Sequence, residues 1–349
     1  MKNLNVKGSP YFAAWLAEHQ LSIAFSSYQA GKLFLLGRKP ESQLAIFERS
    51  FNRCMGLWSN GQTLWAATAS QLLRFENLLA TPEDGFDCLF VPRLAVITGD
   101  IDIHDLACDG DQLFYISTLF SVVATRSDRA SFKPYWVPPF ISRLTPEDRC
   151  HLNGLAMRDG QPHYATAVAV SDQAEGWRAH RLCGGCLIDI PANKIILEGL
   201  SMPHSPRWHE GKLWLLDSGN GYLGYHDGNQ FKRVAFLPGY ARGLALVGNY
   251  AIIGISRPRH EETFSGLALE KELARRNQQP RCGLVVVDLA NGALLHWLWL
   301  EGGQINELYD VALLPGIARP KLLGLKSDEM QYTVNYEGSP SIWRGHRPD

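Results

Sequence analysis

The stretch Asn153-GLAMRDGQPHYATA, residues 153–167, decides the fold because it is one copy of a unit that recurs along the chain. A short apolar run, a polar turn with Gly, and a second run rich in Leu, Trp, Tyr and Ala are typical of two antiparallel strands joined by a tight turn. The same unit begins at five further positions, namely Met55, His104, His204, Arg242 and Tyr309. Six copies of one strand pair predict an all-β repeat protein.

The spacing of the copies identifies the kind of repeat. The residue after each leading one serves as an anchor, and the anchors are Gly56, Asp105, Gly154, Ser205, Gly243 and Asp310. Most intervals are close to the ~40 to 50 residues of a four-stranded propeller blade. The long last interval contains Ser265-GLALEKELARRN, whose leucine spacing predicts a helical insertion at residues 260–281 in the fifth blade. We therefore predict a six-bladed β-propeller.

The two chain ends are expected to close the ring. The sixth unit, Tyr309-DVALLPG followed by Pro320-KLLGL, runs out of strands after Leu325, whereas three strand-like runs at residues 21–50 precede the first unit. A blade shared by both ends removes the exposed edges of an open sheet. We predict one domain over residues 1–349, with residues 1–20 as an N-terminal helical extension. The residues leave open which terminal strands complete the closing blade.

Charge and cysteine usage exclude several classes of partner. Lys plus Arg number 34 and Asp plus Glu number 35, and the net charge of −1 argues against general binding to nucleic acid or to an anionic membrane. No apolar run approaches ~18 residues, the first residues lack a signal-peptide pattern, and seven scattered cysteines fit reduced thiols. These features predict a cytoplasmic protein with no nucleic-acid or membrane partner.

The residues just before the inner strands of a propeller converge on one mouth of the central channel. Those positions carry two equivalent imidazoles, an amide and a carboxylate, which are His104, His204, Asn153 and Glu307. We predict that these four bind one divalent metal ion, and the mixed N/O donors favour Fe, Zn or Mn over Ca. The alternative is a polar channel lining whose side chains only satisfy backbone groups.

Further residues at the mouth suit catalysis and substrate binding. His151 lies two residues before Asn153, on the same side of the strand, and His151 or Asp102 is predicted to transfer a proton. Arg242 suits a carboxylate or phosphate of a substrate, and Tyr240 and Arg53 are predicted to bind substrate with it. The alternatives are a loop histidine at 151 and an ion pair of Arg242 with Glu307 or Asp102.

Five longer stretches resemble a large family of bacterial proteins of unknown function, some of which are joined to tetratricopeptide repeats. They are Tyr28-QAGKLFLLG, Arg53-CMGLW, Trp136-VPPFISRLTPEDRCHLNGLAMRDG, Ser201-MPHSPRWHEGKLWLLDSGNG and Glu307-LYDVALLPG. The EDRCHLNGLA and MPHSPRW segments are the most specific, and the resemblance covers nearly the whole chain. It implies a six-bladed propeller without an assigned reaction.

A more distant resemblance links His151-LNGLA and the blade rhythm to the metal-dependent gluconolactonase and regucalcin propellers. Their metal ligands include an Asn in an N-G-hydrophobic motif and a carboxylate that opens a blade, so the resemblance singles out Asn153 and Glu307. This chain departs from them at His104 and His204, where those lactonases would show Asn or Asp. The departure counts against a Ca²⁺ preference and lactone chemistry here.

Two classes of function follow from the sequence. The first is a metal-dependent enzyme, a hydrolase or an oxygenase, that acts on a small molecule or peptide at the channel mouth. The alternative is a noncatalytic module that presents a peptide or protein partner on the same mouth.

Overall fold

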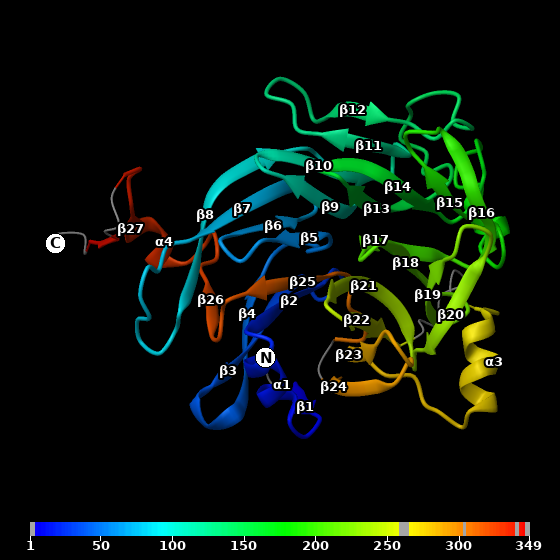
Figure 1. Cartoon of the computed structure of the whole chain (residues 1–349). Helices are drawn as coiled ribbons and strands as arrows, with labels where there is room; N and C mark the ends of the chain where they lie inside the picture. Colours follow the sequence, from blue (N-terminus) through cyan, green and yellow to red (C-terminus); the bar gives the residue numbers. More distant parts are fainter. Residues whose placement is uncertain (1–3, 258–264, 303–304, 339–341, 346–349) are drawn as a thin grey trace.

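Six antiparallel sheets stand around a central axis in the computed structural model, which describes residues 4–257, 265–302, 305–338 and 342–345 (Figure 1). The innermost strand of each sheet faces the axis, and each contacts the inner strands of its two neighbours. In chain order these inner strands are β5 (Leu57–Ser59), β9 (Ile103–Asp109), β13 (Leu152–Arg158), β17 (Pro203–His209), β21 (Tyr240–Val247) and β25 (Val311–Pro315). The predicted six-bladed propeller is confirmed.

The blades are numbered here by their inner strands, and the first five take their other strands in simple sequence order. Blade 1 adds β6 (Thr63–Ala67), β7 (Gln71–Asn77) and β8 (Cys88–Ile97); blade 2 adds β10 (Gln112–Ser117), β11 (Val122–Thr125) and β12 (Lys133–Trp136). Blade 3 adds β14 (Gln161–Ala167), β15 (Gly185–Asp189) and β16 (Lys194–Leu200); blade 4 adds β18 (Lys212–Asp217), β19 (Tyr222–His226) and β20 (Phe231–Phe236). Blade 5 adds β22 (Tyr250–Ser256), β23 (Gly283–Asp288) and β24 (Leu294–Glu301).

Blade 6 is built from both ends of the chain, as predicted. Its inner strand β25 pairs with β2 (Leu21–Ser27), and β3 (Lys32–Lys39) and β4 (Gln43–Ser50) complete it. The segment Pro320-KLLGL does not supply the second strand that the sequence analysis gave it, because β2 already occupies that position. Its residues form β26 (Pro320–Leu322), which pairs in parallel with β8 on the outer edge of blade 1.

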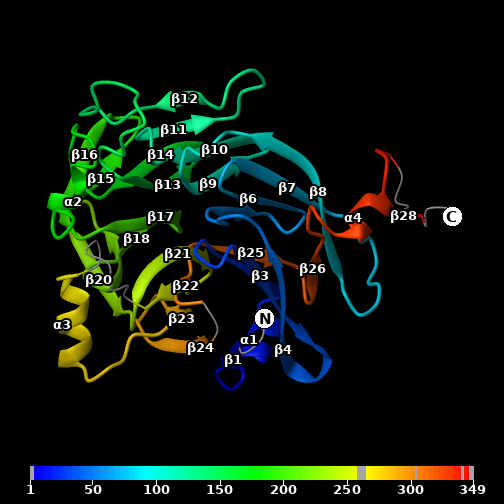
Figure 2. The same cartoon turned by 180° about the vertical axis from the view of Figure 1, so that it is seen from behind.

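The remaining elements decorate the ring. The N-terminal segment contains β1 (Asn5–Gly8), a fifth strand on β24, and α1 (Phe12–Glu18), which packs on the layer between blades 5 and 6. The expected helical insertion in blade 5 is α3 (Ala268–Arg275), although residues 260–264 of the predicted range lie outside the described residues. The other elements are α2 (Trp177–His180), α4 (Asp328–Tyr332), η1 (Pro40–Ser42), β27 (Thr333–Val334) and β28 (Trp343–Arg344). Figure 2 shows α4 and the C-terminal end outside the ring, beside blade 1. None of the helices in the described ranges is long and apolar enough to cross a membrane.

The hydrophobic core is divided into six layers, one between each pair of neighbouring blades. Along β10, Leu113 and Tyr115 pack toward blade 1, whereas Phe114 and Ile116 pack toward blade 3. Because both faces of a blade are covered, the second strands are apolar at successive positions instead of alternating with polar residues. This explains the runs of Leu, Trp, Tyr and Ala in the repeat.

The six anchors contact one another in a ring around the axis. Glycine stands in blades 1, 3 and 5, and a hydrogen-bonding side chain stands in blades 2, 4 and 6. Each of these side chains accepts a hydrogen bond from a backbone N–H of the following blade: Asp105 Oδ2 from Leu155 (2.9 Å), Ser205 Oγ from Gly243 (3.1 Å) and Asp310 Oδ2 from Leu57 (2.8 Å). Each glycine lets the next blade approach closely, because a side chain there would meet backbone atoms of that blade. A Cβ added at Gly56 would lie 3.2 Å from Asp105 Cα, and one added at Gly154 would lie 3.0 Å from Ser205 N. A Cβ added at Gly243 would lie 2.7 Å from Asp310 Cα. The anchors thus surround one axis.

Arg207 of blade 4 crosses the channel next to this ring. Its guanidinium donates two hydrogen bonds to the Asp105 carboxylate of blade 2, at 2.8 and 3.1 Å, and lies 3.8 Å from Asp310 of blade 6. It also donates to the carbonyls of Leu155 and Leu244 in blades 3 and 5. The Arg207 side chain therefore connects five blades across the channel.

Candidate functional site at the channel mouth

The backbone just before four consecutive inner strands adopts the left-handed conformation, which non-glycine residues rarely occupy. The residues concerned stand three positions before their anchors and have φ of 53° at Arg53, 55° at Asp102, 51° at His151 and 45° at Met202. In blades 2 and 4 this turn brings the carbonyl back toward the side chain two residues later. The Nδ1 atom of His104 lies 3.2 Å from the Asp102 carbonyl, and Nδ1 of His204 lies 2.8 Å from the Met202 carbonyl.

These contacts fix the tautomer of both imidazoles. A carbonyl oxygen only accepts, so Nδ1 of His104 and of His204 carries the proton and Nε2 keeps its lone pair while the ring is neutral. Burial lowers the pKa of His104 to about 4, and burial together with the Arg242 guanidinium lowers the pKa of His204 well below 6.5. Nε2 of His204 is buried without a hydrogen-bond partner among the described residues. Both rings are therefore neutral at neutral pH, and each keeps an unprotonated Nε2.

His151 is oriented by a carboxylate instead of a carbonyl. Its Nδ1 donates to Asp148 Oδ2 at 2.8 Å, and the same oxygen accepts the indole N–H of Trp177 at 2.8 Å. Burial by itself would raise the pKa of Asp148, but the charge and hydrogen bond of His151, together with His104 and the Trp177 indole, lower it below its ordinary value. The Trp177 ring, on α2, lies 4.2 Å from the His151 ring between centroids. The result is an imidazole whose Nδ1 is held by an ionised carboxylate and whose Nε2 can take a proton.

Six side chains from five blades form a contiguous group that we call the mouth cluster: His104, His151, His204, Tyr240, Arg242 and Tyr309. The ring centroids of His151 and His104 lie 4.9 Å apart, and those of His104 and Tyr309 lie 5.4 Å apart. Arg242 Cζ lies 5.0 Å from the Tyr309 ring and 5.2 Å from the Tyr240 ring, which in turn lies 5.8 Å from His204. All six are at most 9% exposed. The structure therefore brings together five predicted site residues and Tyr309.

The other predicted residues make different contacts. Asn153 Oδ1 accepts the Thr166 hydroxyl at 2.8 Å, and Glu307 Oε1 accepts the Ser27 hydroxyl at 2.6 Å and the Gln29 N–H at 2.9 Å. Both side chains are buried, and Glu307 also interacts electrostatically with the Arg242 guanidinium. Over the described part of the chain, no group of three or more His, Cys, Asp or Glu side chains is placed to hold a metal ion. The four-residue cation site stays a prediction.

Asp102 and Arg53 lie at the rim. Asp102 Oδ2 is 3.6 Å from His104 Nδ1, and its side chain is one-third exposed. Arg53 pairs with Asp100 and lies 3.8 Å from Asp102 Oδ1. Both side chains are partly exposed, and their predicted roles, proton transfer by Asp102 and substrate binding by Arg53, stay predictions.

Sequence reasoning assigned no role to several residues of the site, which are Tyr28, Asp148, Trp177 and Tyr309. The contact of Asp148 with His151 could have been predicted, because the two residues stand three positions apart in the sequence. The contact of Trp177 with His151 could not, because α2 interrupts the turn between β14 and β15 and reaches His151 only in the folded protein. Burial raises the pKa of Tyr309 well above its usual range, so this phenol remains protonated beside Arg242.

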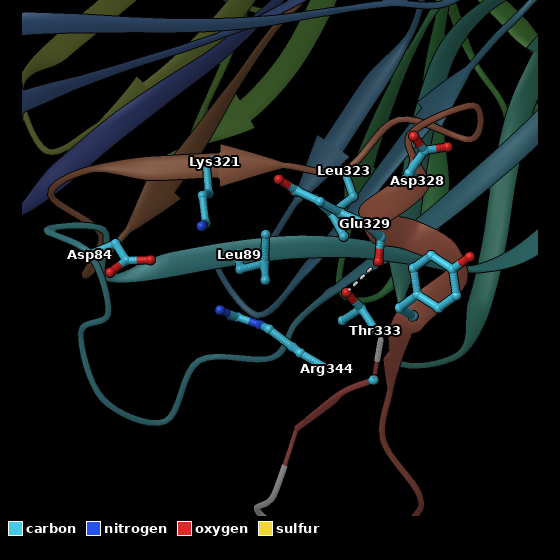
Figure 3. A pocket seen from close by; sticks show the side chains of 10 residues that line it. Asp84, Leu89, Lys321, Leu323, Asp328, Glu329, Thr333 and Arg344 are labelled. Atoms are coloured by element: carbon cyan, nitrogen blue, oxygen red, sulfur yellow. Dashed lines mark hydrogen bonds between the residues drawn. The ribbon is translucent and has the colours of Figure 1, made fainter. Parts of the chain in front are cut away.

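A separate cavity of about 470 Å³ lies at the outer edge of blade 1 (Figure 3). Leu89 of β8 and Leu323 form its apolar part, and residues of α4 together with Thr333 and Arg344 also line it. It shares no residue with the mouth cluster.

The fold and site define a six-bladed β-propeller with a buried group of histidines, tyrosines and an arginine at the channel mouth. The chain belongs to the family described as Domain of unknown function (DUF4915), whose sequence profile matches residues 10–323. This agrees with the resemblance to a family of unknown function.

Comparison with curated proteins gives no match. Similar solved structures include a chain of a nidogen/laminin complex, with a TM-score of 0.52, 12% identity, and coverage of 85% of this chain and 99% of that one. A gluconolactonase from Xanthomonas campestris gives a TM-score of 0.47, 13% identity, and coverage of 83% and 87%. A streptogramin B lyase structure has a TM-score of 0.45 and 10% identity, and the match covers 89% of this chain and 91% of that one. At these identities the similarities concern the fold alone.

The depressed pKa of His104 predicts a loss of stability in acid. The unfolded chain binds a proton near pH 6.5 and the folded protein only near pH 4, so this contribution is complete above pH 6.5 and is lost as pH falls toward 4. The shift corresponds to about 3 kcal/mol of unfolding free energy. His204 acts in the same direction. We expect urea unfolding curves to show this decline, and the variant H104Q/H204Q to show a shallower one. The exposed substitution His180→Gln is the control, and equal slopes in all three proteins would refute the prediction.

Proposed function

We propose that the mouth cluster is the catalytic site of a hydrolase that acts on a small molecule or peptide carrying an anionic group. The main support is the hydrogen bond between His151 and Asp148. This pair lies in the same cluster as the neutral imidazoles of His104 and His204 and the Arg242 guanidinium. A histidine oriented by an ionised carboxylate is suited to moving protons at neutral pH. A channel lining that only satisfied backbone groups would have no need of such a pair.

Arg242 is proposed to bind the anionic group of the substrate. Its guanidinium lies between the Tyr240 and Tyr309 rings, which restrict its orientation, and the residue is 8% exposed. In this dry surrounding a charge-assisted hydrogen bond to a carboxylate or phosphate is stronger than in water. Tyr240 and Tyr309 would thereby position the substrate through Arg242.

His151 is proposed to act as the general base and then as the general acid. Nε2 takes a proton from a water molecule as the water oxygen forms a bond to the acyl carbon of the substrate. The bond from that carbon to the leaving oxygen or nitrogen then breaks, and the protonated His151 returns the proton to the leaving atom. Asp148 stabilises the transient imidazolium and keeps the ring in the required tautomer.

A second candidate is the metal-dependent form of the enzyme. Nε2 of His104 and of His204 would hold a divalent cation, with Fe, Zn or Mn favoured by imidazole ligands. The supporting observation is that both Nδ1 atoms donate to backbone carbonyls, as they do in many metal-binding histidines. Such an ion would polarise the substrate carbonyl.

A pair of chromogenic esters tests the hydrolase proposal. We expect mono-p-nitrophenyl glutarate, which carries a free carboxylate, to have a kcat/KM about 10- to 100-fold above that of neutral p-nitrophenyl acetate, the value of one charged hydrogen bond. Arg242→Gln should abolish this preference, whereas His151→Asn should lower kcat about 10²- to 10⁴-fold on both esters. His180→Asn is the matched control.

Metal analysis separates the two candidates. Protein purified without chelator should contain stoichiometric metal that is lost in H104A/H204A if the cation is part of the site. Turnover by metal-free wild type supports the His151 mechanism alone. No turnover above buffer in either form, together with no effect of His151→Asn, would overturn the enzyme proposal in favour of a noncatalytic peptide- or protein-binding module.

A further inference from the structure

A cleft of about 1010 Å³ lies between blades 6 and 1, next to the mouth cluster. Its walls are the β2–β3 turn at residues 28–31, the connection from β4 to β5, the β6–β7 turn at residues 68–71, and the segment 324–327 that follows β26. These turns belong to the same end of the propeller as the residues before the inner strands, because second strands run antiparallel to inner strands. The cleft therefore opens on the face that carries the candidate site.

The charges in the cleft are of one sign. Arg49, Arg53 and Lys326 line it, and no Asp or Glu does so among the described residues. Arg53 is paired with Asp100, but neither Arg49 nor Lys326 has an ion-pair partner in the described part of the chain. The Arg49 side chain lies over the Phe47 ring and beside Gly324, where an added Cβ would be 3.6 Å from Arg49 Cδ. Arg49 and Lys326 thus place two positive charges without ion-pair partners among the described residues on the wall of one polar cleft.

Two residues that line the cleft connect it to the mouth cluster by direct contacts. The Tyr28 ring lies 5.5 Å from the Tyr309 ring between centroids. Arg53 lies 3.8 Å from the Asp102 carboxylate, and the Asp102 carbonyl holds His104. A ligand whose end reaches Arg242 would therefore extend along Tyr28 and Arg53 into the cleft.

The longer insertions lie on the opposite side of the mouth. The β14–β15 and β22–β23 connections carry α2 and α3, and their residues Trp177, Leu267 and Leu273 pack together beside Met202 and Tyr240. Blades 6 and 1 have only short turns at the equivalent positions. Apolar side chains from the insertions of blades 3 and 5 therefore pack beside the mouth on that side, and the cleft lies across the mouth from them.

We propose that the cleft binds the distal part of an elongated polyanion whose terminal anionic group is held at Arg242. This proposal rests on the proposed function, because it assigns the substrate class of the same site. Arg49 and Lys326 are specificity residues: they favour a long ligand with several anionic groups over a short one that reaches only Arg242. They contact the part of the ligand away from the reacting bond.

Binding of two carboxylate probes of different length tests the proposal. We expect triglutamate, measured by isothermal titration calorimetry, to bind wild type at least tenfold more tightly than glutarate in low salt, and to lose this advantage in 1 M NaCl. Arg49→Gln and Lys326→Gln should each weaken triglutamate about three- to fivefold, typical of a partly exposed ion pair, and leave glutarate unchanged. Lys321→Gln removes the same charge outside the cleft and is the control. Tripolyphosphate in place of triglutamate distinguishes phosphate from carboxylate recognition.

The outcomes separate this proposal from the proposed function. Equal binding of all probes, or cleft variants that behave like Lys321→Gln, would overturn the cleft proposal while glutarate binding that depends on Arg242 persists. Failure of every probe, with no effect of Arg242→Gln, would overturn the anion site itself.

Discussion

Gly243→Ala is expected to lower the free energy of unfolding by about 2 to 4 kcal/mol, because two costs act at one position. Gly243 has φ of 73°, a region that an alanine occupies only with strain. An added Cβ would also lie 2.7 Å from Asp310 Cα and from Val311 N, which are backbone atoms that cannot rotate away. The substitution therefore pushes blade 5 away from blade 6, the closing blade that both chain ends build.

Gly248→Ala is the matched control for this effect. Gly248 has φ of 48° in the same hairpin, and an added Cβ there meets nothing within 4 Å. It should cost only the conformational strain of about 1 kcal/mol. Urea unfolding followed by tryptophan fluorescence measures both variants. Equal losses at the two positions would show that close approach between blades 5 and 6 contributes nothing.

Arg207→Met is expected to destabilise the protein by about 3 kcal/mol, since it leaves buried carboxylates without their cation. Asp105 and Asp310 are each 3% exposed, whereas the Arg207 side chain is 22% exposed. Because the cation is only partly buried, the expected loss of stability lies at the lower end of the range for a broken buried ion pair. Each carboxylate keeps its backbone hydrogen bonds, so the variant should fold and be measurable.

The loss should also depend on pH. Burial, with the nearby Asp105, raises the pKa of Asp310 to about 7. A raised native pKa means that the folded state binds the proton more tightly, so the contribution of this group to stability falls as pH rises toward 7. A protonated Asp310 needs no cation, and Arg207→Met should therefore cost less at pH 6 than at pH 8. Arg158→Met, at a partly exposed site, serves as the control, and a loss independent of pH would contradict the assignment.

The repeat pattern was sufficient to predict the fold because the same interblade packing recurs six times. Each second strand must be apolar on both faces, and that requirement is visible in the sequence. Pro320-KLLGL was misassigned because its apolar residues fit a second strand equally well, and only the pairing of β2 with β25 decides between them. β1 was not predicted, since a four-residue, mostly exposed strand leaves no pattern.

The candidate site could be predicted in part for the same reason. Positional equivalence in the repeat places His104, His204 and Arg242 at one mouth, and in the structure their side chains belong to one contiguous group. Contacts that depend on irregular segments were out of reach, such as Trp177 on His151. The sequence also could not show that Asn153 is hydrogen-bonded to Thr166 within its own blade.

A binding site at the channel mouth is tested most directly by titrating wild-type protein with glutarate while recording histidine ring ¹⁵N and ¹H NMR signals. The predicted result is that the signals of His104, His151 and His204 shift together with a single dissociation constant, that outer histidines such as His180 do not move, and that Arg242→Gln abolishes the shifts. Shifts confined to the outer histidines, or no shift of the three mouth histidines at any concentration, would contradict the site.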